Sequence, residues 1–138
     1  MRIVFGLLGF GVISFLFILE GGHLKSLFHA PLLVSSLAAP LLLCIAHHTP
    51  SRLSKALRAV VGTGQDKPEE NAQNLLVLST LRMLFWSTGA VFHLLGYIHT
   101  LQNLSDPSKI GVGIAVAFLS LLYALIFAEM LIGPSINR

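Results

Sequence analysis

His93 is an ionisable side chain near the middle of an apolar stretch, "LFWSTGAVFHLLGYIHTL". Gly89, His93, Gly96 and Thr100 follow one another at spacings of four, three and four, which places them on one stripe of a helix. An ionisable group at mid-membrane is costly and by default indicates a functional site with a partner. The other reading, a neutral imidazole that hydrogen-bonds a neighbouring helix, stays open.

A second stripe of small and polar residues runs along the last apolar stretch. Its members recur at helical spacing: Gly113, Ala117, Ser120, Ala124 and Ala128. His93 lies about eight residues below Leu101 and Ser120 about ten below Ile110, so at ~1.5 Å per residue both lie roughly 12–15 Å from the same end. Two polar side chains at one level could line a narrow water-filled path or bind a polar group of a partner. The alternative is that both stripes only let helices pack closely.

The acidic residues near the apolar stretches all fall towards the ends of those stretches. Glu20, Asp106 and Glu129 are the residues concerned, so no carboxylate lies at mid-membrane in this chain. Glu129 could snorkel to the interface or balance Arg82 or Arg138.

Histidine and cysteine spacing does not indicate a metal or an enzyme site. His47 and His48 are adjacent, so on a helix they point about 100° apart. Cys44 is the only cysteine, which leaves no disulfide. A bis-histidine haem carrier would need a second mid-membrane histidine opposite His93, and His99 lies towards the end of its segment. No phosphate loop, nucleophile elbow or metal-ligand cluster is present, so we expect no enzyme, no cofactor and no metal.

The composition predicts an integral membrane protein. A mean hydropathy of +0.80 with 11% charged residues is too apolar for a soluble chain of 138 residues. Because a hydrocarbon core of about 30 Å needs roughly 20 helical residues, we predict four transmembrane helices, at about 3–19, 31–46, 83–101 and 110–132. The expected fold is a single all-α membrane domain over 1–138, built from two helical hairpins.

A polar linker, 47–82, joins the two predicted hairpins. Thr49 and Pro50 are typical of a helix start, and the pattern over Arg52–Val61 predicts a basic amphipathic helix at the inner interface. We expect it to anchor on anionic headgroups, with a docking surface as the less favoured alternative. The stretch "GTGQDKPEENAQ" that follows is expected to be a flexible connector.

The distribution of basic residues predicts the orientation. Seven of them fall on one side of the four segments: Arg2, Arg52, Lys55, Arg58, Lys67, Arg82 and Arg138. Only Lys25 and Lys109 fall on the other side. Since basic residues are retained inside, both termini and the linker are expected to be cytoplasmic. The N-terminal segment is not expected to be a cleaved signal peptide, because no small-residue cleavage site follows it.

The last third of the chain resembles the final hairpin of the MotA/TolQ/ExbB proton-channel family, most nearly its MotA branch. There a "DPS" turn leads into a small-residue segment, then "AVALLTTLYG" and a terminal proline. Here these elements are "SDPS" at Ser105–Ser108, "GVGIAVAFLSLLYA" at Gly111–Ala124, and Pro134. The family's threonine pair becomes Ser120 and Leu121, which keeps one hydroxyl.

The resemblance is looser in the rest of the chain. The MotA pattern G-x-x-G-T-x-x-G falls on Gly89 through Gly96, with Phe92 in place of the middle glycine and His93 in place of the threonine. "EGGHLKSLFHAPLLVSSLAA", from Glu20 to Ala39, is similar to the N-terminal hairpin. The large cytoplasmic domain of MotA proteins has no counterpart in the linker, so torque transmission by that route is not expected.

The resemblance implies a pore-forming subunit of a membrane motor driven by the proton motive force. Such subunits form homopentamers around a dimeric single-pass partner of the MotB, TolR or ExbD type, whose intramembrane aspartate carries the proton, in the bacterial inner membrane. The residues expected to line the ion pathway are His93, Ser120, Gly89, Gly96, Thr100, Ala117, Ala124, Tyr123 and Glu129. Because this chain has no carboxylate at mid-membrane, the resemblance implies that the proton-carrying acid comes from the partner, and that Glu129 could help discharge protons at the inner end. Protons are favoured over sodium because one hydroxyl is lost. The alternative function is a non-conducting membrane scaffold.

Overall fold

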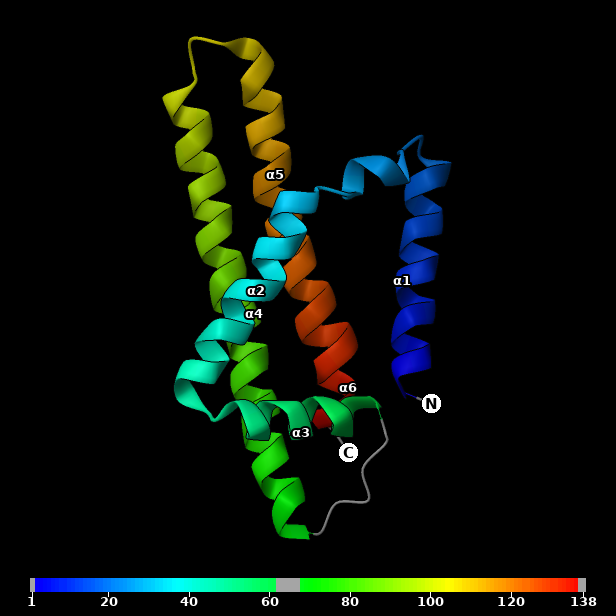
Figure 1. Ribbon diagram of the computed structural model, residues 1–138. Helices are drawn as coiled ribbons and strands as arrows, with labels where there is room; N and C mark the ends of the chain where they lie inside the picture. Colours follow the sequence, from blue (N-terminus) through cyan, green and yellow to red (C-terminus); the bar gives the residue numbers. More distant parts are fainter. Residues whose placement is uncertain (1, 62–67, 137–138) are drawn as a thin grey trace.

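The structure, a computed structural model, describes residues 2–61 and 68–136, and this part of the chain is helical without a strand (Figure 1). The elements are α1 (Arg2–Leu19), the 3₁₀ helix η1 (Leu24–Leu27), α2 (Ala30–His47), α3 (Pro50–Val61), α4 (Pro68–Gln102), α5 (Pro107–Leu125), the π-helical segment η2 (Ile126–Ile132) and α6 (Gly133–Ile136). The predicted all-α class is thereby confirmed for the described residues.

Within the described residues, three stretches of helix are long and apolar enough to cross a membrane: Ala30–His47, Glu70–Gln102 and Pro107–Ile136. They contain the predicted segments 31–46, 83–101 and 110–132. The first predicted segment, 3–19, coincides with α1, but several side chains of α1 lie outside the described part of the molecule. The fourth span, and the cytoplasmic placement of the termini, therefore remain predictions.

Local sequence signals explain where two of the spanning helices begin. At the start of α2, a ring nitrogen of His29 accepts the backbone N–H of Leu32 at 3.3 Å. At the start of α5, Asp106 accepts the backbone N–H of Ser108 at 3.2 Å. In both cases the capping side chain satisfies an N–H that the first helical turn leaves without a partner, and a proline occupies the first turn.

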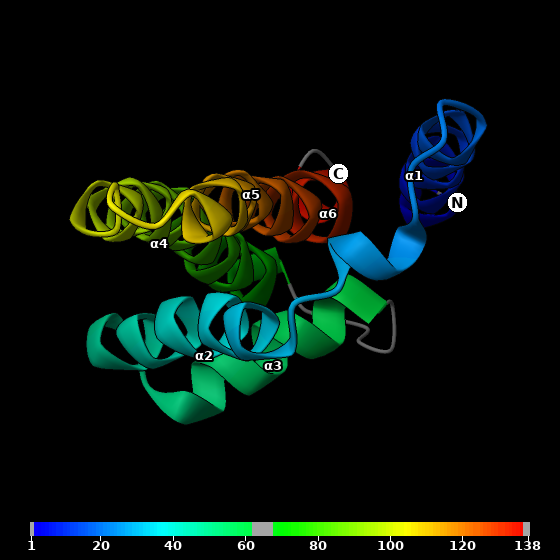
Figure 2. The ribbon, with the colours of Figure 1, turned by 90° about the horizontal axis from the view of Figure 1, so that it is seen from above.

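The helices α4 and α5 form a long antiparallel pair, and the other elements pack on it (Figure 1). α2 lies against both members of the pair, whereas α3 crosses α4. α1 stands beside η2 and α6, apart from α2 (Figure 2). The start of α1 and the end of α6 lie at the same end of the bundle as α3 (Figure 1).

Two buried clusters hold α2 and α3 on the pair. The larger one joins Cys44 of α2 and Leu53 of α3 to Leu81 of α4, and extends to η2. The smaller one joins Leu32 of α2 to Leu119 and Tyr123 of α5. α2 contributes its buried residues at intervals of four, Leu32, Ser36, Pro40 and Cys44, so one stripe of this helix faces the pair.

The linker differs from the expectation at its second half. The predicted basic helix is present as α3, but the expected connector is helical from Pro68 onward, in the first turns of α4. Pro68 and the acidic residues after it favour a helix start, and Asn74, Val77 and Leu78 are buried. Burial of this stripe in the contact with α3 and α2 stabilises a helix where the sequence is mostly polar. Residues 62–67 of the expected connector lie outside the described residues.

Candidate functional site

The two small-residue stripes face each other along the contact between α4 and α5. A side chain added at Gly96 would place its Cβ 2.7 Å from the Cβ and 2.8 Å from the Cα of Ala117. At Gly113 a Cβ would meet the hydroxyl of Thr100. The two backbones can therefore approach this closely only because glycine occupies these positions.

We call this contact the α4–α5 seam. It consists of Gly89, Gly96, Thr100, Gly113, Ala117, Ser120 and Ala124. Ser120 and Ala117 are both 0% exposed, and a Cβ on Gly89 would collide with Ala124. Six of the residues expected to line the ion pathway thus pack against each other within one chain: Gly89, Gly96, Thr100, Ala117, Ser120 and Ala124.

His93 lies at the edge of the seam and bonds across it. Its Nδ1 is 2.8 Å from the carbonyl oxygen of Ala117. Because a carbonyl only accepts, Nδ1 carries the hydrogen and donates. The hydroxyl of Ser120 donates to the same oxygen at 2.6 Å. The two polar residues that the sequence places at one level are therefore joined through a single acceptor.

The imidazole of His93 also lies against two aromatic rings. Its centroid is 4.7 Å from that of Tyr97 and 5.5 Å from that of Phe118, both in edge contacts. Phe118 is 57% exposed, whereas the next residue, Leu119, is buried against α2. Successive residues of a helix point about 100° apart, so Phe118 and the rings beside it lie on a different side of the pair from the one that contacts α2.

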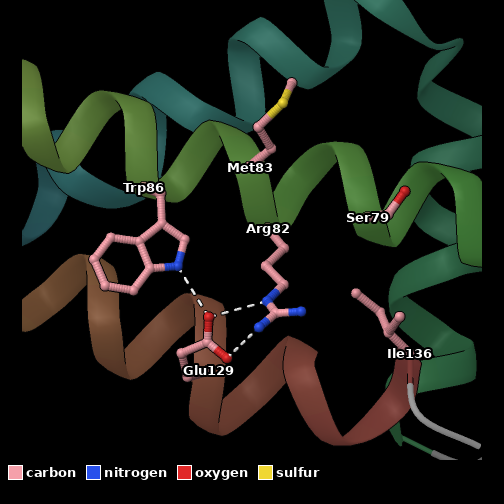
Figure 3. A pocket seen from close by; sticks show the side chains of 6 residues that line it. All are labelled: Ser79, Arg82, Met83, Trp86, Glu129 and Ile136. Atoms are coloured by element: carbon pink, nitrogen blue, oxygen red, sulfur yellow. Dashed lines mark hydrogen bonds and ion pairs between the residues drawn. The ribbon is translucent and has the colours of Figure 1, made fainter.

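Glu129 lies in η2 and is bound by two side chains of α4 (Figure 3). Arg82 donates from Nε to Oε1 at 3.0 Å and from Nη2 to Oε2 at 2.5 Å. Trp86 donates its indole N–H to Oε1 at 2.9 Å. Of the two balancing residues considered from sequence, Arg82 is the partner, and Arg138 lies outside the described residues. Trp86 was not expected, although its spacing of four from Arg82 could have indicated it.

We call Arg82, Trp86 and Glu129 the Glu129 cluster. They border an open cavity of about 310 Å³, together with Ser79, Met83 and Ile136 (Figure 3). Arg82, Trp86, His93 and Tyr97 recur at spacings of four, seven and four, which puts them on one stripe of α4. The Glu129 cluster, His93, Tyr97 and Phe118 therefore form one face of the α4–α5 pair, which we call the polar face.

Tyr123 does not share that face. Its ring is 5% exposed and packs against Leu32 and Leu119. Its hydroxyl donates to the carbonyl of Leu27 at 2.7 Å and accepts the backbone N–H of His29 at 3.0 Å. Tyr123 thus ties α5 to the chain that leads into α2.

Two further histidines, His47 and His48, lie at the end of α2. Nδ1 of His47 donates to the carbonyl of Leu43 at 2.8 Å, and Nε2 of His48 is 3.3 Å from the hydroxyl of Thr80. Over 2–61 and 68–136, no three histidine, cysteine or acidic side chains converge as metal ligands would.

Comparison with known proteins gives matches that cover most of this architecture. Residues 25–138, which contain α2 to α6, match the family described as the MotA/TolQ/ExbB proton channel family. A protein named motility protein A from Aquifex aeolicus (strain VF5) is 37% identical over 70 residues, 51% of this chain and 28% of that protein. Motility protein A from Cereibacter sphaeroides is 40% identical over 50 residues, 36% of this chain and 20% of that protein. The matched region spans less than a third of each relative.

Proposed function

The chain belongs to the MotA/TolQ/ExbB proton channel family, and from this we propose that it is the pore-forming subunit of a membrane motor driven by the proton motive force. Membership places the chain among membrane-embedded proton channels, which are not an enzyme family. The assembly we propose is a homopentamer around the dimer of a single-pass protein of the MotB, TolR or ExbD type, in the bacterial inner membrane.

The observation that carries the proposal is the polar face of the α4–α5 pair. We place α1 and α2 towards lipid, so that the side of the α4–α5 pair that neither helix covers would surround the partner. That side holds the imidazole of His93, half-buried, and the Glu129 cluster. Ionisable side chains in spanning helices typically face the interior of an assembly or a water-filled path.

The ion pathway we propose is narrower than the set expected from sequence. His93 lies at its middle and Glu129 towards its inner end, whereas the α4–α5 seam behind them keeps the two helices together. The carboxylate that gains and loses the proton is proposed to come from the partner, because this chain has none at mid-membrane. The imidazole would relay the proton or position that acid.

A non-conducting scaffold is the second candidate, and one observation favours it. The small residues that a pore could use are occupied by packing within one chain, since Ser120 and Ala117 are 0% exposed. Such a scaffold would assemble through the same helices but move no ions.

Purification from native membranes, followed by native mass spectrometry, tests the assembly. A pentamer that retains two copies of a single-pass protein with an intramembrane aspartate would support the motor. A monomer or dimer in mild detergent would contradict it. Proton flux is then measured in vesicles that contain the complex, for His93→Ala and for His93→Thr, which restores the MotA residue.

The three flux outcomes separate the roles of His93. Loss of flux in His93→Ala with only partial recovery in His93→Thr indicates a relay. Good recovery in His93→Thr indicates positioning. Flux in both variants equal to that of the wild type would place the ion pathway elsewhere, and absence of flux in every form of the assembled complex would favour the scaffold.

A further inference from the structure

The π-helical segment η2 is centred on Glu129. It spans Ile126–Ile132, and the backbone N–H of Gly133 bonds to the carbonyl of Ala128, five residues back. Pro134 follows directly; it lacks an N–H and its ring would clash with the carbonyl four residues earlier in a regular α-helix. Well under 1% of residues adopt this conformation, and short π segments are frequent at functional sites. The proline explains why the helix departs from α geometry here, but does not by itself fix how η2 sits on α4.

The Glu129 cluster connects η2 to α4. Arg82 and Trp86 project from two successive turns of α4 and place three donors on one carboxylate. Two of these bonds come from a guanidinium in the bidentate arrangement, which is the strongest and most directional class of side-chain hydrogen bond. The side chains of Arg82 and Glu129 are 37% and 33% exposed, so the rest of the chain covers most of the pair.

The hydrogen bonds of Glu129 also indicate whether its carboxylate could carry protons. A carboxylate that carries protons must exchange its partners in each cycle, because its oxygens alternately bind and release hydrogen. Here both oxygens are already engaged, Oε1 by two donors and Oε2 by one. The cavity beside the cluster is open, and both donor residues border it.

We propose that Arg82 and Trp86 clamp Glu129 so that η2 is fixed against α4, with Glu129 acting as a fixed anion instead of a proton carrier. The clamp of η2 on α4 is argued from the geometry of one chain. The role of Glu129 as a fixed anion rests on the proposed function, since it concerns the inner end of that ion pathway. Arg82 and Trp86 are positioning residues in this scheme.

The first test does not depend on ion flux. Trp86 is the only tryptophan of the chain, so its fluorescence reports on the cluster without further labels. We compare Glu129→Leu and Arg82→Leu with Glu70→Leu, a control on the same helix whose carboxylate pairs with Lys55 at 3.5 Å on an exposed surface. The measurements are the tryptophan emission spectrum, its quenching by acrylamide, and amide hydrogen exchange of residues 126–133.

The clamp predicts a changed emission spectrum and stronger quenching in Glu129→Leu and Arg82→Leu, but not in the control. It also predicts exchange about tenfold faster in 126–133, the effect of lowering a local opening free energy by about 1.4 kcal/mol. Trp86→Phe, which removes one donor and retains the ion pair, should accelerate exchange less. Exchange within about twofold of the wild type in both leucine variants would overturn the clamp.

The second test separates the fixed anion from a proton carrier. Arg82→Gln and Glu129→Gln alone leave one charge without its partner in a partly buried site, which is destabilising. The double variant Arg82→Gln/Glu129→Gln can retain neutral hydrogen bonds but has no carboxylate. A fixed anion predicts that flux falls in each single variant and returns towards the wild-type rate in the double variant.

Flux in the double variant that stays as low as in Glu129→Gln, with exchange of 126–133 restored, would overturn the fixed-anion role and identify Glu129 as a carrier. If the wild-type complex itself moves no protons, the proposed function fails. The clamp is then decided by fluorescence and exchange alone.

Discussion

His93 and Ser120 donate hydrogen bonds to the same acceptor, the carbonyl oxygen of Ala117, at 2.8 and 2.6 Å. One donor comes from α4 and the other from the same helix as the acceptor. Ser120 also lies 3.4 Å from the carbonyl of Gly89, across the α4–α5 seam. The shared oxygen therefore links both helices at one level of the bundle, on the border between the seam and the polar face.

The shared acceptor predicts that His93→Ala and Ser120→Ala are not additive. Either donor alone keeps a side-chain hydrogen bond on the carbonyl of Ala117, so the hydrogen-bond part of each single loss should be about 0.5–1.5 kcal/mol of unfolding free energy at most. The double variant should lose more than the sum, because a partly buried oxygen then lacks side-chain donors. The unfolding free energies of the wild type, the two single variants and the double variant are measured by reversible unfolding in mixed micelles. His99→Ala, at an exposed position of α4, is the control. Strict additivity would contradict the shared role.

The α4–α5 seam predicts that Gly96→Ala is disruptive. The added methyl would meet the Cα and Cβ of Ala117, and neither can rotate away, so overpacking should cost about 1–3 kcal/mol. Gly111→Ala on α5 is the matched control, because a Cβ there has nothing within 4 Å. In an exposed helix that change should be neutral or stabilise by up to about 1 kcal/mol. Equal melting temperatures of the two variants would refute the close approach.

The bonds of Tyr123 predict a local effect of Tyr123→Phe. The variant keeps the packed ring but removes the hydroxyl that binds Leu27 and His29, each bond being worth about 1 kcal/mol. Amide exchange should accelerate over η1 and the first turn of α2, while the seam keeps its protection. Tyr97→Phe, on the polar face, should leave η1 unchanged. An effect spread evenly over the bundle would argue against this tie.

Asp106 predicts a pH-dependent cap at the start of α5. Hydrogen bonds from the Ser108 hydroxyl and then from Lys109 lower the pKa of this carboxyl below its ordinary value. A carboxyl with a lowered folded-state pKa stabilises the fold above its unfolded pKa of about 3.9, and this contribution is lost as pH falls through the folded-state pKa. Melting temperatures of the wild type should therefore fall more steeply with acid than those of Asp106→Asn.

The comparison with Asp106→Ala separates capping from charge. Asparagine caps helices about as well as aspartate, so at neutral pH Asp106→Asn should stay close to the wild type and Asp106→Ala should be less stable. Identical melting temperatures of all three proteins at every pH would show that the cap contributes nothing measurable.

Several features of the molecule could be predicted from the sequence because they depend on local chemistry. The apolar stretches around 31–46, 83–101 and 110–132 are helical since a backbone in lipid must satisfy its own hydrogen bonds. The start at Pro50 follows from Thr49 and the proline, whereas the last helix begins at Pro107, three residues before the predicted 110, because Asp106 caps it. The stripes of Gly89 to Thr100 and Gly113 to Ala128 follow from the helical period alone.

The linker is a segment whose structure the local sequence does not predict. Polar and acidic residues around Glu70 indicate a connector when they are considered alone. The same stretch is helical because Val77, Leu78 and Leu81 are buried in the core with Leu53 of α3. Which apolar residues of a mixed stretch become buried depends on what packs against them, and that partner lies on another helix.

The sequence by itself determined that this chain is a helical membrane protein and which residues share a stripe, because these depend on residue type and helical period. Only the tertiary structure decided what each stripe faces. In the structure, Ser120 and Ala117 lie in the α4–α5 seam, and His93 lies on the polar face. Tyr123 contacts the start of α2. Glu129 is bound by Arg82 and Trp86. The rotation of one helix about its axis is set by contacts with its neighbours, which the spacing of residues along one chain segment does not encode.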